Sequence, residues 1–103
     1  MSVIEVTKAS FEQEVLKSEV PVLADFNAGW CGPCRAMKPM LDELAEGNSA
    51  YKIVSIDIDE EDELAEEYDV SSIPCLVVFQ GGEEVNRSVG LIAKEAIAEL
   101  VEG

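Results

Sequence analysis

The sequence predicts an α/β domain with a β-hairpin on one side of its sheet. Two runs, residues 20–26 and 53–58, are almost wholly apolar or β-branched, which is typical of strands covered on both faces. Segments with helical spacing of apolar residues alternate with these runs, as in α/β proteins. Two further strand-like runs are joined by Gly81-Gly82, which predicts the hairpin.

The N-terminal part of the chain predicts a strand, a helix and a second strand. Residues 3–6 form a short strand candidate. Ser10 is a candidate N-cap, and Gln13 completes a capping box with it. Apolar residues then recur at helical spacing, at Phe11, Val15 and Leu16. The apolar run from Val20 to Phe26 follows as an interior strand.

The middle of the chain predicts a helix, a strand and another helix. The first of these helices starts near Cys31, and Gly47 with Asn48 is a typical stop signal. Its apolar side contains Met37, Met40, Leu41, Leu44 and Ala45. Residues 53–58 are rich in β-branched side chains and predict a strand. Residues 59–68 predict an acidic helix with Leu64, Ala65 and Tyr68 facing inward.

The C-terminal part predicts the hairpin and a last helix. The hairpin strands are expected at 75–79 and 84–89, and the helix at 93–101. The predicted order is β-α-β-α-β-α-β-β-α, without a linker, a repeat or a low-complexity segment. We therefore expect residues 1–103 to form a single domain, which is long enough to bury a core.

Charge and hydropathy exclude several classes of function. The chain carries 22 acidic and 7 basic residues, a net charge of −15. Phosphate binding needs clustered Lys and Arg, so nucleic acids and anionic membranes are not expected partners, and the acidic surface is interpreted as a solvated face. No apolar run approaches the roughly 18 residues of a membrane span. The N-terminus lacks the pattern of a signal peptide, so we expect a cytoplasmic protein.

The stretch Trp30-Cys31-Gly32-Pro33-Cys34 carries the clearest chemical signal. If a helix begins here, Cys31 lies at its N-terminus and Cys34 one turn inside, so the two sulfurs can form a disulfide. Pro33 suits the first turn, where its missing N–H is not needed. Free N–H groups and the helix dipole favour a Cys31 thiolate, the form that attacks disulfides. This predicts dithiol–disulfide exchange, although a C-x-x-C pair alone also occurs in zinc ribbons.

Residue counts argue against a metal site. The chain has three cysteines and no histidine. A zinc or iron–sulfur site built from cysteines alone needs about four of them, and an odd count argues against a structural disulfide framework. We expect no metal and no cofactor, because Cys31 and Cys34 can carry the electrons themselves.

The cysteine stretch and its surroundings resemble the active-site signature of the thioredoxin family. The shared features, in the family's order and spacing, are Trp30-Cys31-Gly32-Pro33-Cys34, Val22-Leu23-Ala24-Asp25-Phe26, Pro39, Ile73-Pro74, Gly82 and Val89-Gly90. The resemblance implies the thioredoxin fold, with a central mixed five-stranded sheet flanked by four helices. It also implies a protein disulfide reductase that is recharged by a thioredoxin reductase, takes oxidised proteins as substrates and is a monomer.

The resemblance assigns roles around the cysteine pair. Cys31 is the expected nucleophile, which forms a mixed disulfide with the substrate, since the family's first cysteine is the exposed one. Cys34 is the resolving thiol, which attacks Cys31 and releases the reduced partner. Asp25 stands in an apolar strand, where burial would raise its carboxyl pKa. The family match makes it the buried acid/base behind Cys34; on the sequence alone it could instead end a strand and face solvent.

The resemblance also outlines a contact surface for substrates. Pro74 matches the family's cis-proline, although without the match an ordinary trans-proline opening a strand would be expected. The backbone of Ile73 is implied to pair with an extended substrate segment. The implied substrate-binding residues are Trp30, Gly32, Pro33, Ile73, Val89 and Gly90. Trp30 is expected to shield the sulfur, with a plain core position as the alternative.

Three positions depart from the family pattern. Ser55 stands where many members carry a lysine that pairs with the buried carboxylate, which predicts a more easily protonated Asp25. Asn27 stands where many carry a tryptophan, so packing beside the site, and with it the redox poise, should differ. Cys75, where threonine is common, is interpreted as a small buried residue; the alternative is a third thiol that traps or regulates the site.

Two other classes of function remain open. A binding subunit could clasp a larger protein through the same surface without redox chemistry. A disulfide oxidase or isomerase acts in oxidising compartments and generally replaces the Gly-Pro pair, and a glutaredoxin usually carries Pro-Tyr there. Gly32-Pro33 between the cysteines therefore favours a reductase over these redox relatives.

Overall fold

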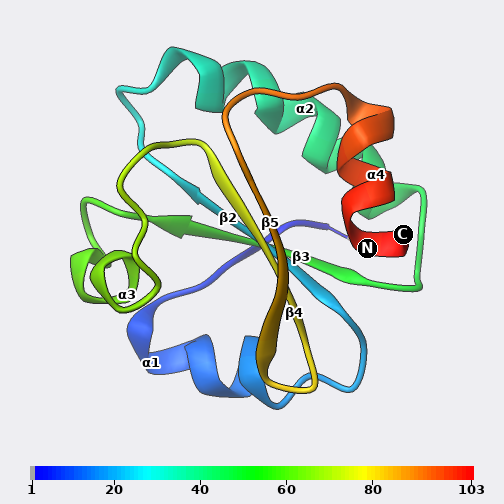
Figure 1. The fold of residues 1–103 in the computed structure, drawn as a ribbon, viewed down its shortest axis with the longest axis horizontal. Coiled ribbons are helices and arrows are strands. Elements are labelled where there is room, and N and C mark those ends of the chain that lie inside the picture. Colours follow the sequence, from blue (N-terminus) through cyan, green and yellow to red (C-terminus); the bar gives the residue numbers. More distant parts are fainter. Residues whose placement is uncertain (1) are drawn as a thin grey trace.

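The computed structural model describes residues 2–103, and its strands form one sheet in the order β1-β3-β2-β4-β5. The central strand β2 (Val22–Asn27) runs parallel to β3 (Lys52–Asp57), which in turn runs parallel to β1 (Ile4–Glu5). On its other side β2 pairs antiparallel with β4 (Cys75–Gln80), and β4 with β5 (Glu83–Val89). The mixed five-stranded sheet that the resemblance implied is thus confirmed (Figure 1).

Helices cover both faces of this sheet (Figure 1). One face carries α1 (Lys8–Phe11), which continues into the π-helical turn η1 (Glu12–Leu16), together with α3 (Asp62–Glu67). The other face carries α2 (Gly32–Glu46) and α4 (Lys94–Glu102). Within the described residues, no helix is long and apolar enough to cross a membrane.

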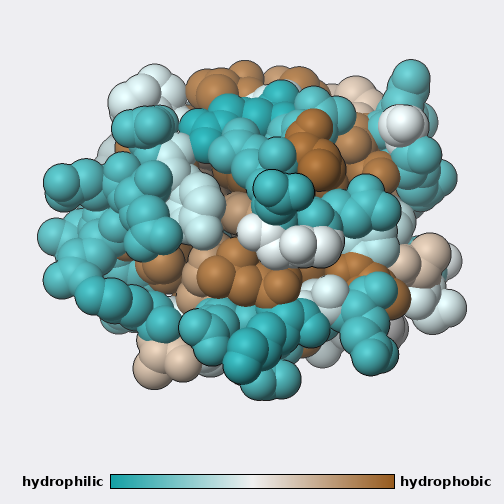
Figure 2. All heavy atoms as spheres, turned by 60° about the horizontal axis from the view of Figure 1, so that its bottom comes forward, coloured by the Kyte–Doolittle hydropathy of each residue, from teal (hydrophilic) through white to brown (hydrophobic). Residues whose placement is uncertain are grey.

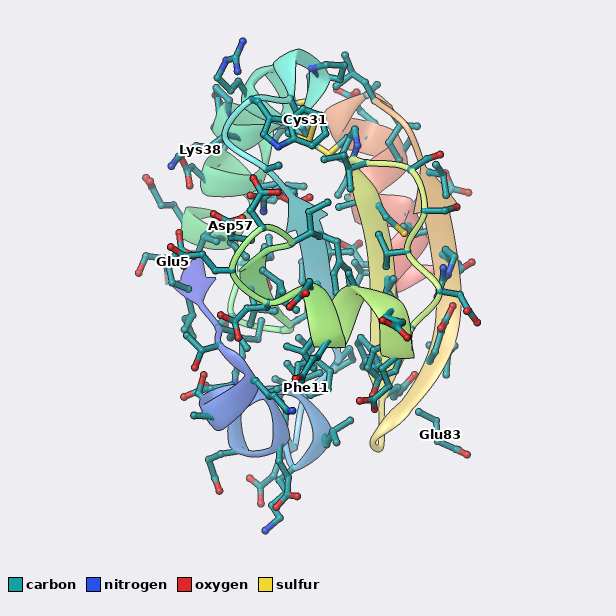
Figure 3. All side chains as sticks on the ribbon, turned by 90° about the vertical axis from the view of Figure 1, so that its left-hand side faces the viewer. Glu5, Phe11, Cys31, Lys38, Asp57 and Glu83 are labelled. Atoms are coloured by element: carbon teal, nitrogen blue, oxygen red, sulfur yellow. A yellow bond between two sulfur atoms is a disulfide. The ribbon has the colours of Figure 1, made fainter. Side chains whose placement is uncertain are left out.

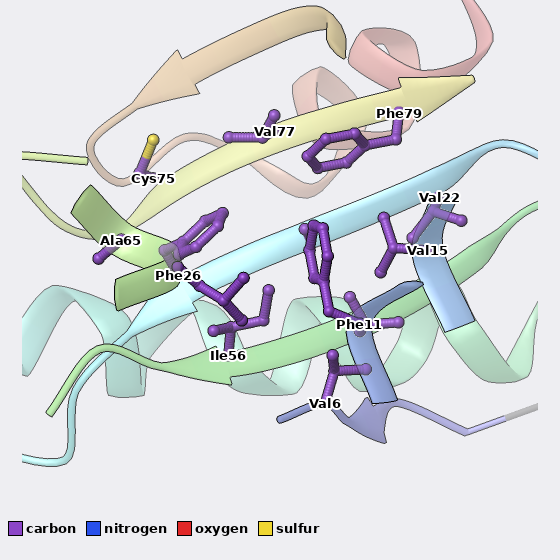
Figure 4. Packing of buried hydrophobic residues seen from close by; sticks show 13 residues of the cluster. Val6, Phe11, Val15, Val22, Phe26, Ile56, Ala65, Cys75, Val77 and Phe79 are labelled. Atoms are coloured by element: carbon purple, nitrogen blue, oxygen red, sulfur yellow. The ribbon is translucent and has the colours of Figure 1, made fainter. Parts of the chain in front are cut away.

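Each face of the sheet has its own hydrophobic core, because successive side chains on a strand point to opposite faces. Along β2, Ala24 and Phe26 face α1 and α3, whereas Leu23 faces α2 and α4. Strand β4 alternates in the same way. Figure 4 shows the first of these cores, in which Phe11 and Phe79 pack edge to face. Burial on both faces explains why the central strands read as continuous apolar runs.

Two helices begin three residues away from the predicted position, and the last helix begins at Lys94, one residue later than predicted. The N-cap of the first helix is Thr7 rather than Ser10, because the Ser10 hydroxyl accepts the backbone N–H of Thr7 at 3.0 Å and so acts from inside the first turn. The acidic helix begins at Asp62 rather than at residue 59. Residues 58–60 form a turn, in which the Asp59 N–H donates to a carboxylate oxygen of Asp57 at 2.9 Å.

Candidate active site

The cysteine pair lies where the chain leaves the central strand β2 and enters α2 (Figure 3). Cys31 is the N-cap of this helix and forms a disulfide with Cys34, with the two Cα atoms 5.2 Å apart. Pro33 lies in the first turn. The backbone N–H of Cys34 donates to Sγ of Cys31 at 3.2 Å. After reduction, the same donor and the positive helix end would stabilise a thiolate on Cys31.

Both cysteines are covered, which differs from the expectation that Cys31 is the exposed one. Each is 5% exposed. The cover comes from apolar neighbours, since both pack with Ala28, Ile58 and Ile73. Sγ of Cys31 lies 4.0 Å from the carbonyl oxygen of Ile73. In this disulfide form, the N-cap position rather than exposure distinguishes Cys31 from its partner.

The residues next to the disulfide lie on the surface. The Trp30 side chain is 67% exposed, which excludes a plain core position, and its indole N–H donates to a carboxylate oxygen of Asp59 at 2.9 Å. Gly32 and Pro33 are also exposed. The indole, the Gly-Pro pair and the disulfide therefore border one surface at the start of α2.

The loop before β4 meets the end of β5 beside the disulfide. The Ile73–Pro74 peptide bond is cis, the isomer that the resemblance implied. The N–H of Gly90 donates to the carbonyl of Pro74 at 2.8 Å, and Val89 pairs with Cys75 across the strands. Gly90 has φ of 100°, a conformation that favours glycine. The structure thus brings together predicted contact residues that are distant in the sequence.

Asp25 is a buried carboxylic acid beneath the site. It is 5% exposed, and burial raises its pKa from 3.8 to about 7. A hydrogen bond from Asn27 lowers this pKa, and the nearby charge of Glu5 raises it further. Oδ2 accepts that bond at 3.2 Å, while Oδ1 is buried without a hydrogen-bond partner among the described residues. Such a group changes its protonation near neutral pH.

A cavity of about 380 Å³ connects Asp25 with the disulfide. Both Asp25 and Cys34 line it, so the acid and the inner cysteine border the same space. Its other polar and charged walls are Glu5, Asn27, Arg35, Lys38, Asp42 and Ser55. Figure 3 shows Lys38 and Glu5 on the side of the molecule below Cys31. The cavity is wide enough to hold water.

Asn27 makes contacts that the sequence reasoning missed. Its side-chain amide donates to Oδ2 of Asp25 at 3.2 Å, to the Asp25 carbonyl at 2.9 Å and to Oγ of Ser55 at 2.8 Å. Ser55 is the register partner of Asp25 on β3. One signal was present in the sequence: residues i and i+2 of a strand share a face, which places Asn27 on the same side as Asp25.

Cys75 belongs to the core under α1 and α3 (Figure 4), whereas the disulfide belongs to a different cluster of buried residues. It is 1% exposed, and burial raises the pKa of its thiol. Both properties disfavour the thiolate that exchange requires. The structure therefore supports the interpretation of Cys75 as a small packed residue. Within residues 2–103, no cluster of His, Cys, Asp or Glu side chains is arranged to hold a metal ion.

The chain is similar to known proteins over almost its whole length. Residues 2–103 match the family model described as Thioredoxin. A thioredoxin of Bacillus subtilis strain 168 is 50% identical over 102 residues, which cover 98% of this chain and 96% of that protein. A bifunctional thioredoxin reductase/thioredoxin of Mycobacterium leprae strain TN is 47% identical over 95 residues, which cover 91% of this chain and 21% of that longer protein. The solved structure of a mutant thioredoxin from Halobacterium salinarum NRC-1 has a TM-score of 0.90 at 38% identity, covering 98% of this chain and 88% of that one.

Proposed function

Since this chain belongs to the thioredoxin family, we propose that Cys31 is the thiol that attacks oxidised proteins and that Cys34 is the thiol that releases them. The chain is a thiol–disulfide oxidoreductase of the protein disulfide reductase type, with a redox-active cysteine pair at disulfide distance. Recharging by a thioredoxin reductase is typical of the family. The observation that carries the assignment of Cys31 is the 3.2 Å hydrogen bond from the Cys34 N–H to its sulfur.

The exchange proceeds in two thiolate attacks. The Cys31 thiolate attacks one sulfur of the substrate disulfide, so that a mixed disulfide forms and the other substrate sulfur leaves as a thiolate that takes up a proton. Cys34 then loses its proton and attacks Sγ of Cys31. The second substrate thiol is released, and the Cys31–Cys34 disulfide seen in the structure is the product. Two electrons have passed from the dithiol to the substrate.

Asp25 is the proposed acceptor of the Cys34 proton. A carboxyl group whose pKa is about 7 is about half ionised at neutral pH, and so has both a free base form and enough basicity to take a proton. Asp25 and Cys34 line the same cavity, in which water can carry the proton between them.

The proposed substrate surface surrounds the disulfide. A substrate segment that lies along the backbone of Ile73, beside the cis-proline Pro74, would approach Cys31, because the Ile73 carbonyl oxygen is 4.0 Å from its sulfur. The other proposed contact residues are exposed or partly exposed, and they are Trp30, Gly32, Pro33, Val89 and Gly90. Backbone pairing with exposed apolar neighbours suits many unrelated protein substrates.

The proposed partners are oxidised proteins and a thioredoxin reductase. The name of the M. leprae relative combines a thioredoxin reductase and a thioredoxin in one protein. This supports a thioredoxin reductase as a partner of the present chain. The net charge of −15 disfavours nucleic acids and anionic membranes. We further propose that the chain acts as a monomer in the cytoplasm.

Reduction of insulin disulfides by dithiothreitol tests this function. We expect the wild-type protein to accelerate the reaction and the Cys31→Ser variant to give only the uncatalysed rate. Cys75→Ser is the matched control, because it removes a buried thiol that belongs to a different cluster from the disulfide, and it should retain the wild-type rate. Full activity of Cys31→Ser would refute the assignment. Lack of acceleration by the wild type would instead favour a binding subunit.

A further inference from the structure

Asn27 connects the buried acid to the neighbouring strand. It is the last residue of β2, two positions after Asp25, and its amide reaches Ser55 on β3. We propose that Asn27 is a positioning residue, which fixes the Asp25 carboxyl group and thereby sets the pH range over which the mixed disulfide is released. This inference rests on the proposed role of Asp25 as acceptor of the Cys34 proton.

The two carboxylate oxygens of Asp25 have different surroundings. The Asn27 amide has two hydrogens, and it is held by the Asp25 carbonyl at 2.9 Å and by Ser55 Oγ at 2.8 Å as well as by Oδ2 of Asp25 at 3.2 Å. Two hydrogens serve three acceptors, so the contact to Oδ2, which is the longest of the three, shares a hydrogen with a closer acceptor. Oδ1 is buried without a partner among the described residues, so it is the oxygen left to exchange a proton with Cys34 across the shared cavity.

Asn27 also balances charges that act on Asp25. A donor to the carboxylate favours its ionised form, whereas burial and the Glu5 charge from β1 oppose ionisation. From α2, the cavity is lined by the cations Arg35 and Lys38 and by the anion Asp42. None of the ion pairs found within residues 2–103 includes Asp25. The neutral amide of Asn27 thus provides the hydrogen bond that favours the ionised form of Asp25.

The first test measures the Asp25 titration directly, by carbon NMR of the carboxyl group in the oxidised protein. Asn27→Leu removes the donor at similar size, and Asn27→Val removes it with a β-branched residue that suits strands. Both should raise the midpoint from about 7 by about one pH unit. Asn86→Leu is the matched control, because this amide donates to the Leu100 carbonyl, away from the site; it should leave the midpoint unchanged. Ser55→Lys should lower it, since it places a cation beside the carboxylate.

The second test measures release of a mixed disulfide against pH by stopped flow. A midpoint higher by about one pH unit reduces the ionised fraction at pH 7 from about one half to about one tenth. Release by Asn27→Leu should therefore be about fivefold slower at pH 7 and equal to the wild type well above the new midpoint. A merely structural defect would slow release at every pH.

The two readouts separate the possible failures. An unchanged NMR midpoint in both Asn27 variants would overturn the positioning role and leave the reductase function intact. A shifted midpoint with an unchanged release profile would overturn the link to release, and it would remove Asp25 as proton acceptor. Failure of the wild-type protein in the insulin assay, by contrast, would concern the proposed function and not Asn27.

Discussion

Replacing Asp25 by asparagine should stabilise the protein at neutral pH. Burial raises the folded-state pKa of Asp25 to about 7 from 3.8. Between these two values the unfolded chain has released the proton while the folded protein retains it. Proton binding to Asp25 therefore contributes fully to the free energy of unfolding below about pH 4. This contribution is lost as the pH rises through the folded-state pKa of about 7. Asp25→Asn removes the titration and keeps the shape of the side chain.

The size of the effect follows from the pKa difference. A rise from 3.8 to about 7, at about 1.4 kcal/mol per pH unit, corresponds to up to about 4 kcal/mol at and above pH 7. That is a large share of the ~5–15 kcal/mol stability of a typical domain. The side chain is only 5% exposed, so solvent screens this cost weakly.

Urea unfolding of wild type and Asp25→Asn between pH 4 and 9 measures this difference. The many other carboxylates of the chain titrate equally in both proteins and cancel in the comparison. We expect the variant's advantage in free energy of unfolding to grow from pH 4 to 7 and then to level off. A difference that does not change with pH would refute the burial argument. A variant that is less stable at pH 7 would show that the ionised group is stabilising.

Three further predictions concern stability and reactivity. Arg87→Ala should lower the free energy of unfolding by about 1–2 kcal/mol in urea, because Arg87 pairs with Glu84 at 2.7 Å and donates to the Tyr68 carbonyl at 2.6 Å; an unchanged midpoint would argue that these contacts add nothing. Added salt should raise the melting temperature, since the net charge of −15 is self-repulsive and salt screens it; a melting temperature that falls would contradict this. In the reduced native protein, a thiol reagent should modify Cys75 only after unfolding, because this thiol is 1% exposed; rapid native modification, read by mass spectrometry, would revive its regulatory role.

The hydrophilic composition of the chain is reflected in the surface of the structure. Figure 2 shows one face of the molecule that is covered mainly by hydrophilic side chains, with apolar patches between them. The ion pairs in the part that the structure describes engage few of the 22 acidic residues. Most of the acidic side chains are therefore balanced by solvent and dissolved ions rather than by ion pairs. This is the reason why the melting temperature is expected to depend on salt.

Elements with strong local signals could be predicted from the sequence. The apolar run of β2 indicates a doubly covered strand, and the helix start at Cys31 follows from Pro33 and the apolar spacing behind it. The first helix was misplaced because Thr7 and Ser10 are both good N-caps. The π-helical turn that follows, in which the Lys17 N–H donates to the Glu12 carbonyl, is not indicated by any local sequence pattern.

Long-range features of the site could not be derived from residue patterns. Ile73 approaches Cys31 from 42 positions away along the chain, and only the family resemblance implied this contact. The contacts of Asn27 depend on the parallel register that sets Asp25 beside Ser55. Periodicity predicts which face a side chain occupies, but it contains no information on which strands become neighbours.

Trapping the mixed disulfide tests the central claim most directly. Cys34→Ser removes the resolving thiol, so the reduced variant should accumulate a covalent adduct with an oxidised peptide, and peptide mapping by mass spectrometry identifies the attached cysteine. We expect one adduct, at Cys31, whose sulfur accepts the helix N-terminal N–H at 3.2 Å. An adduct at Cys75, or no adduct at all, would contradict it.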